Sequence, residues 1–208
     1  MELIDKYMKK AFQLIATIII FFINQNTFSQ KYDCGWYGKK TVAERNKVFP
    51  FNKAKKVVLI SYLGEMDGYL KKGDTRDFNE ANGIIKTENI TIGNHKVSYK
   101  IKEEIVIDRK SVEELSNIMV NYTLKHKPKG MLLISEAACY TPRNSVLFLD
   151  EKDEVICNFE ICFECFRTNM YPDTAINNYS QIEECYPRFE LLKGFFSKNG
   201  VKYGVEDN

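Results

Sequence analysis

Residues 145–165 read SVLFLDEKDEVICNFEICFEC and contain the pattern that decides the fold. Ser145 to Asp150 and Val155 to Phe163 are two runs rich in branched and aromatic side chains, which favour β-strands. Glu151 to Glu154 places four charged residues between the two runs. The stretch therefore predicts a β-hairpin with a tight turn.

The second strand of this hairpin divides its side chains between two faces, because neighbouring residues of a strand point in opposite directions. One face carries Val155, Cys157, Phe159, Ile161, Phe163 and Cys165. The other face carries Asn158, Glu160, Cys162 and Glu164. We interpret the two glutamates as residues of a solvated face, since charged side chains are rarely buried without a partner.

Further strands precede the hairpin. Val57 to Tyr62 is a β-branched run typical of a buried strand. Asn89 to Ile92 and Val97 to Ile101 flank the dipeptide Gly93-Asn94, which suits a two-residue hairpin loop. The strands lack the alternating strand and helix order of a parallel sheet, so they favour antiparallel pairing.

Two stretches show helical periodicity. Ser111 to Glu114 is a capping-box sequence, and the apolar spacing after it predicts a helix from Val112 to about Lys125. An apolar stripe at 189–196 predicts a last helix, with Pro187 interrupting or restarting it. The chain is thus expected to be α+β, a mainly antiparallel sheet with two or three packing helices, reinforced by disulfides.

Residues 1–29 have the three-part pattern of a secretory signal peptide. A lysine-rich start precedes an apolar run from Ala11 to Ile23, and small polar residues follow as far as Ser29. The run is shorter than the roughly 18 to 20 residues that cross a bilayer. We expect cleavage, a single domain at 30–208, and export to the periplasm or the extracellular space. The alternative is an uncleaved leader that tethers the chain to the inner membrane, its only membrane contact.

Composition narrows the function classes. Thirty basic and 28 acidic residues give a net charge of +2, whereas nucleic-acid binders usually carry a strongly basic surface. The chain shows no paired-carboxylate, Ser/His/Asp or phosphate-loop motif, and its two histidines, His95 and His126, lack a ligand-like spacing. We expect no nucleic-acid partner and no cofactor, and a binding or structural role more than an enzymatic one.

All six cysteines follow the leader, and an even number of cysteines in an exported chain is typical of disulfides. The disulfide candidates are Cys34, Cys139, Cys157, Cys162, Cys165 and Cys185. The first and the last lie far from the others and are candidates for tying the chain ends together.

Hairpin register suggests a partner for Cys139. A tight turn at 151–154 sets Asp150 opposite Val155 and carries the end of the second strand back toward residues 139–143. Cys165 and Cys162 then both come within reach. We expect Cys139 to pair with one of these two.

Cys162 and Cys165 also form a CxxC sequence, which occurs in redox dithiols and in halves of metal sites. No second CxxC accompanies it. In a continuous strand the two cysteines point to opposite faces, so they can meet only where the strand breaks. The alternative to structural disulfides is therefore a thiol-redox or metal site of Cys139, Cys162 and Cys165; otherwise we expect no metal.

Two other features are candidates for function. Arg143 follows a proline in a turn beside the cysteines, where it could contact an anion, be exposed or pair with a carboxylate. Gly64 to Gly83 is rich in Gly, Asp, Asn and Lys, and it predicts a loop long enough to be suspected of function.

Three motifs carry a resemblance to known proteins. They are CYTPRN at 139–144, ICFEC at 161–165, and a tail with ELLK at 190–193, FF at 195–196 and GVKYG at 200–204. With these motifs and a leader ending in Phe-Ser-Gln, the carboxyl-terminal half resembles a group of uncharacterised exported proteins of Bacteroidetes-type bacteria. The resemblance implies export and singles out the cysteine hairpin, and it implies no activity. Pro187 departs from it, because an unbroken helix is expected there.

Two hypotheses of function follow. The first is a non-catalytic exported domain, held by disulfides, that contacts an envelope protein or a small ligand. The second is an envelope thiol-redox or metal-binding protein that uses the cysteines at 139–165.

Overall fold

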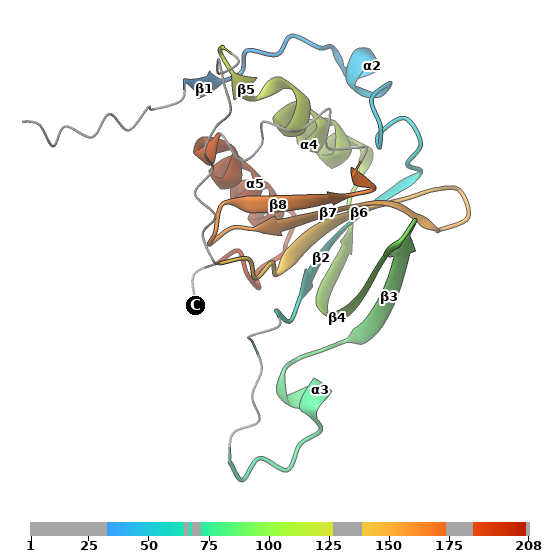
Figure 1. Cartoon of the computed structure of the whole chain (residues 1–208), viewed down its shortest axis with the longest axis vertical. Coiled ribbons are helices and arrows are strands. Elements are labelled where there is room, and N and C mark those ends of the chain that lie inside the picture. The colour runs from blue at the N-terminus through green and yellow to red at the C-terminus, as the bar shows by residue number, and fades with distance from the viewer. Residues whose placement is uncertain (1–32, 65–66, 68–71, 127–138, 174–184, 207–208) are drawn as a thin grey trace, which may run out of the picture. The chain divides into compact units, whose positions relative to one another are not determined.

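The computed structural model describes residues 33–64, 67, 72–126, 139–173 and 185–206 (Figure 1). These residues belong to one compact unit, Tyr32–Asn208. The predicted leader lies outside the described residues. So do residues 131–135, which form a further apolar run, and residues 180–183, which match the capping-box pattern a second time.

Six strands form one antiparallel sheet in the order β3-β4-β2-β6-β7-β8. Their bounds are Lys56–Tyr62 for β2, Lys86–Ile92 for β3, His95–Val106 for β4, Asn144–Leu149 for β6, Val155–Cys162 for β7 and Arg167–Tyr171 for β8. A second sheet pairs β1 (Cys34–Gly35) with β5 (Thr123–Leu124). The hairpins predicted around Gly93 and around 151–154 are both present.

The described helices are α2 (Val42–Arg45), α3 (Phe78–Ala81), α4 (Arg109–Asn121) and α5 (Tyr186–Lys198). Figure 1 shows α4 and α5 on the same side of the sheet. The α+β class with a mainly antiparallel sheet is therefore confirmed. None of the helices in the described part of the chain combines the length and apolar character needed to cross a bilayer.

The sheet is buried on both faces. Val57 and Leu59 of β2 pack with α4 and α5 in one core, whereas Val58 and Ile60 belong to a second core on the opposite face. The sheet curls, so that β3 contacts β7 across this second core. The two central strands, β2 and β6, therefore carry apolar residues at successive positions.

The curl corrects the interpretation of the polar face of β7. Asn158 and Glu160 are buried, and Glu160 is only 6% exposed. Glu164, beyond the end of the strand, is exposed as expected. The prediction was wrong for Glu160 because it treated the hairpin as half-covered, whereas the curled sheet covers its second face as well.

The hairpin register differs from the prediction next to the turn. Val155 pairs with Leu149 and not with Asp150. An irregularity between Phe148 and Leu149 takes up the extra residue, and Asn144 then lies opposite Ile161. The far end of the hairpin therefore has the predicted register, which places residues 139–143 beside the end of β7.

Local capping sets the helix bounds. The N-cap of α4 is Asp108, whose side chain accepts a hydrogen bond from the backbone N–H of Ser111. This helix starts earlier than its capping-box sequence predicts, and it ends at Asn121 because β5 follows. Pro187 lies in the first turn of α5, where its missing N–H removes no helical hydrogen bond, so the helix begins here.

A disulfide joins the two ends of the domain. Cys34 of β1 is bonded to Cys185, the N-cap of α5, with the two Cα atoms 5.8 Å apart. Cys185 is fully buried. The bond ties the amino-terminal segment to the helix that covers the main core.

Candidate functional site

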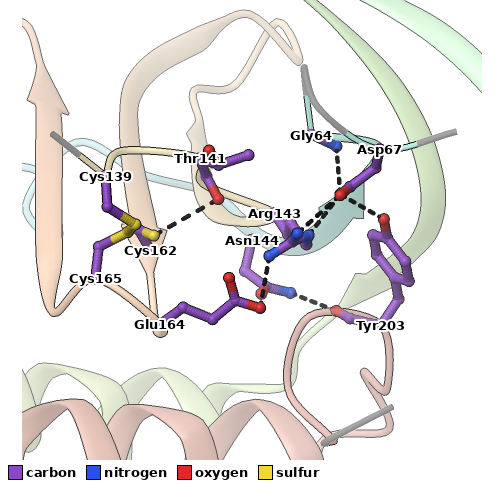
Figure 2. Close-up of polar contacts among 10 residues, drawn as sticks. All are labelled: Gly64, Asp67, Cys139, Thr141, Arg143, Asn144, Cys162, Glu164, Cys165 and Tyr203. Atoms are coloured by element: carbon purple, nitrogen blue, oxygen red, sulfur yellow. Dashed lines mark hydrogen bonds and ion pairs between the residues drawn. A yellow bond between two sulfur atoms is a disulfide. The ribbon is translucent and has the colours of Figure 1, made fainter.

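Four segments that are far apart in the sequence meet at one place, and the carboxyl-terminal tail is one of them (Figure 2). They are Gly64 with Asp67, residues 139–144, the turn at 163–166 between β7 and β8, and residues 203–204. The three motifs that carry the sequence resemblance all contribute to this region. The residues of this region form a connected set of hydrogen bonds and ion pairs, and we take it as the candidate site.

Three sulfur atoms converge at one end of the site. Cys139 and Cys165 form a disulfide with their Cα atoms 5.9 Å apart, which is one of the two pairings that the register favours. Cys162 is a free, buried thiol, and its Sγ lies 3.6 Å from the carbonyl oxygen of Thr141. The three Sγ atoms all lie within 4.8 Å of one another.

The end of β7 explains this convergence. The strand stops at Cys162, and the chain turns through 163–166 before β8 begins. Cys162 is therefore the last residue of β7 and Cys165 lies inside the turn, which is the strand break that their approach requires. Because Cys139 and Cys165 are joined, neither offers a thiolate, and the cluster in this form does not fit a metal centre.

Cys157 stays a free thiol although it was a disulfide candidate. It lies on the face of β7 that packs with the helices, in the main core and away from the three-sulfur cluster. Burial raises the pKa of this thiol to about 12. Cys157 is therefore protonated and unreactive at neutral pH.

Arg143 is held between two carboxylates of the chain itself. Its Nη2 lies 2.7 Å from Asp67 Oδ1, and its Nη1 lies 2.7 Å from Glu164 Oε1. Its Nε also donates to Asp67. Of the three alternatives considered for Arg143, the structure shows pairing with carboxylates. The anions that its guanidinium contacts are side chains of the same protein.

Asp67 collects further donors. Tyr203 donates its hydroxyl to Asp67 Oδ2 at 2.8 Å, and the backbone N–H of Gly64 donates to the same oxygen at 3.2 Å. The hydrogen bonds from Arg143, and then the one from Tyr203, lower the pKa of Asp67 despite its partial burial. Burial and the bond to Asp67 raise the pKa of Tyr203 to about 12. At neutral pH the pair is a carboxylate and a neutral phenol.

Backbone contacts fix the tail against the site. Asn144 donates from Nδ2 to the carbonyl oxygen of Tyr203 at 2.9 Å. Glu103 accepts hydrogen bonds from the backbone N–H groups of Lys202 and Tyr203. Gly204 has φ +73°, and a Cβ there would lie 2.6 Å from Asn144 Oδ1, so only glycine fits.

These walls enclose a cavity of about 390 Å³. Its charged lining consists of Asp67, Glu164, Glu190 and Glu206 against Arg143 and Lys193, that is, four carboxylates and two cations. Phe166 adds a half-buried aromatic ring to the wall. The cavity is thus acidic overall, and the guanidinium in it is already paired.

A second polar cluster lies on the other face of the sheet. Glu160 accepts hydrogen bonds from the hydroxyls of Tyr99 and Tyr140, the latter at 3.1 Å. Asn158 donates to the hydroxyl of Tyr99 and lies close to Ser145. Burial, followed by the charge of Glu160, raises the pKa of both tyrosines, which therefore remain neutral donors.

The sequence patterns did not single out Asp67 or Tyr203, and they placed Glu160 on a solvated face. Asp67 lies in the loop that was suspected of function because of its length, and Tyr203 lies in the GVKYG motif. Neither pattern identified the functional residue itself. The hydrogen-bonding partners of Asp67, which are Arg143 and Tyr203, are more than seventy positions away from it in the chain. His95 stacks on Tyr171 away from this site, and His126 is exposed.

Asp67→Asn is expected to make the stability of the protein less sensitive to acid. The folded-state pKa of Asp67 lies below its ordinary value of 3.8, so its charge stabilises the fold above that value and the contribution is lost as the pH falls through the folded pKa. Urea unfolding between about pH 2.5 and 7 measures this. The parent should lose more stability below pH 4 than the variant, and equal losses would contradict the Asp67–Arg143 assignment.

The fold and the site define a disulfide-bonded α+β domain with an acidic cavity beside a three-sulfur cluster. Comparisons with protein-family models, with curated proteins and with solved structures found no match. The resemblance to exported Bacteroidetes-type proteins therefore stays a prediction from the sequence.

Proposed function

We propose that this chain is an exported, non-catalytic binding domain of the cell envelope, and that its ligand is a small molecule with a cationic group that enters the acidic cavity. Two disulfides support a location outside the cytoplasm, since such bonds persist in oxidising compartments. The signal-peptide pattern at 1–29 supports export across the inner membrane.

The observation that carries this proposal is the charge of the cavity. Asp67 and Glu164 hold Arg143 between them, so this guanidinium is committed to internal carboxylates and is not offered to an anionic ligand. Glu190 and Glu206 are exposed acids on the same lining. A cationic group that approaches the cavity therefore meets a net negative surface.

Size and shape agree with a small ligand. A volume of about 390 Å³ lies at the lower end of the range of ligand pockets, roughly 300 to 1,000 Å³. The walls are held by the Cys139–Cys165 disulfide, by the Asp67–Arg143 pair and by the contacts of Asn144 with the tail. A site built this way is formed before the ligand arrives, so that little ordering is needed on binding.

Titration with agmatine, which has a guanidinium and an amine, tests the proposal against succinate as the anionic counterpart. Chemical shifts of the backbone amides around 163–166 and 203–206 should move and saturate with agmatine and should not respond to succinate. Glu190→Gln combined with Glu206→Gln is expected to weaken agmatine binding about tenfold by removing two attractive charges.

The matched control is Glu151→Gln combined with Glu154→Gln. This double variant removes the same charge from the exposed β6–β7 turn, and its agmatine affinity should equal that of the parent. Absence of saturable agmatine binding would overturn the proposal. So would equal weakening in the two double variants, because the effect would then be one of net charge and not of the cavity.

A further inference from the structure

The three-sulfur cluster contains a thiol next to a disulfide. Cys162 is buried, at 1% exposure, whereas Cys139 is exposed. Their Sγ atoms and that of Cys165 lie within 4.8 Å of one another. Figure 2 shows the three sulfur atoms gathered at one place. A thiolate attacks a disulfide at a sulfur atom and releases the other sulfur as a thiolate, so a thiol this close to a disulfide is placed for exchange.

We propose that Cys162 exchanges with the Cys139–Cys165 disulfide and thereby moves the free thiol of the cluster from the buried strand to the surface. Cys162 gives its proton to solvent, and its thiolate attacks the Sγ of Cys165. The Cys162–Cys165 bond forms, the Cys139–Cys165 bond breaks, and Cys139 leaves as a thiolate that takes up a proton. One disulfide and one thiol are present before and after, so no oxidant or reductant is consumed.

Two features favour attack on Cys165 over attack on Cys139. Cys165 lies in the turn that begins directly after Cys162, so the new bond closes a very short loop without moving distant segments. The leaving sulfur is then that of Cys139, which water can solvate as it becomes charged. A leaving thiolate that is better stabilised leaves faster.

This exchange goes beyond the proposed binding function, because it gives the protein a second covalent form. In the form described above, both free thiols are buried and closed to large reagents. In the exchanged form, the thiol of Cys139 is at the surface, where an external disulfide or an alkylating reagent can reach it. The exchange also removes the covalent bond between Cys139 and the β7–β8 turn.

Alkylation of the folded protein without reductant tests the proposal. The protein is incubated with iodoacetamide, quenched with acid, digested without reduction and mapped by mass spectrometry. We expect the label on Cys139 together with an intact Cys162–Cys165 bond. At high reagent concentration the labelling rate should become independent of that concentration, because exchange then limits it.

Two variants of β7 provide the comparison. Cys162→Ala removes the attacking thiol and should reduce the labelling of Cys139 by at least about tenfold. Cys157→Ala removes the other buried thiol of the same strand and should leave the labelling of Cys139 unchanged. Circular dichroism checks that both variants are folded.

Three results would overturn the proposal. The first is label on Cys162 with the Cys139–Cys165 bond intact, which would mean simple exposure of the buried thiol. The second is equal labelling of Cys139 in Cys162→Ala and in the parent. The third is absence of label on Cys139 under conditions that fully label the unfolded, reduced protein.

Discussion

Replacing Cys34 and Cys185 together by alanine is expected to lower the free energy of unfolding by about 3 to 5 kcal/mol. The bond joins residues 151 positions apart, so in the unfolded chain it closes a loop that includes most of the domain. Opening this loop gives the unfolded chain a large gain in conformational entropy. Urea unfolding in non-reducing buffer measures the difference.

The second disulfide provides the comparison. Cys139 and Cys165 are separated by 26 positions, and the entropy of the smaller loop predicts a loss that is smaller by about 1 to 2 kcal/mol for the corresponding double alanine variant. All four cysteines lie in the described part of the structure. The difference in unfolding free energy between the two double variants should therefore depend mainly on the size of the loop that each disulfide closes. A larger loss for Cys139 and Cys165 than for Cys34 and Cys185 would contradict this account of the fold.

Phe196→Ala is expected to lower the free energy of unfolding by about 3 to 5 kcal/mol. Phe196 is fully buried in the core between α5 and the sheet, and its ring packs edge-to-face against Phe163 with the ring centroids 5.7 Å apart. Phe163 lies in the β7–β8 turn, between the two cysteines of the CxxC sequence. Removing the ring leaves a cavity under the turn that carries the candidate site.

Phe78→Ala is the matched control for this prediction. Phe78 is half-buried in α3, where the ammonium of Lys100 lies 4.4 Å from the centre of its ring. Its loss should cost less than about 1 kcal/mol, because no sealed cavity is created. Similar losses for the two variants would show that α5 does not cover the main core as described.

Local patterns in the sequence were sufficient to predict the two hairpins and the antiparallel pairing of the strands. The β3–β4 turn depends on Gly93, whose φ is +59°, and the neighbouring asparagine, and the β6–β7 turn depends on four charged residues between two apolar runs. Both turns depend on residues that are close together in the sequence, and local sequence patterns are sufficient to predict features of this kind. The same hairpin register brought Cys139 to the end of β7.

The remaining features depend on contacts that no local pattern encodes. Glu160 is buried because the sheet curls far enough for β3 to contact β7, and the curl is a property of the whole sheet. Arg143 meets Asp67 from a position 76 residues away. The hairpin register could not predict which of Cys162 and Cys165 pairs with Cys139, because the pairing depends on how the chain turns after Cys162.

The cavity and the exchange both depend on one covalent arrangement, so the most direct measurement is a disulfide map of the unreduced, acid-quenched protein by mass spectrometry. The predicted result is a Cys34–Cys185 bond, a second bond within the group Cys139, Cys162 and Cys165, and two free thiols, one of them Cys157. Six free thiols, or a bond that includes Cys157, would contradict the account.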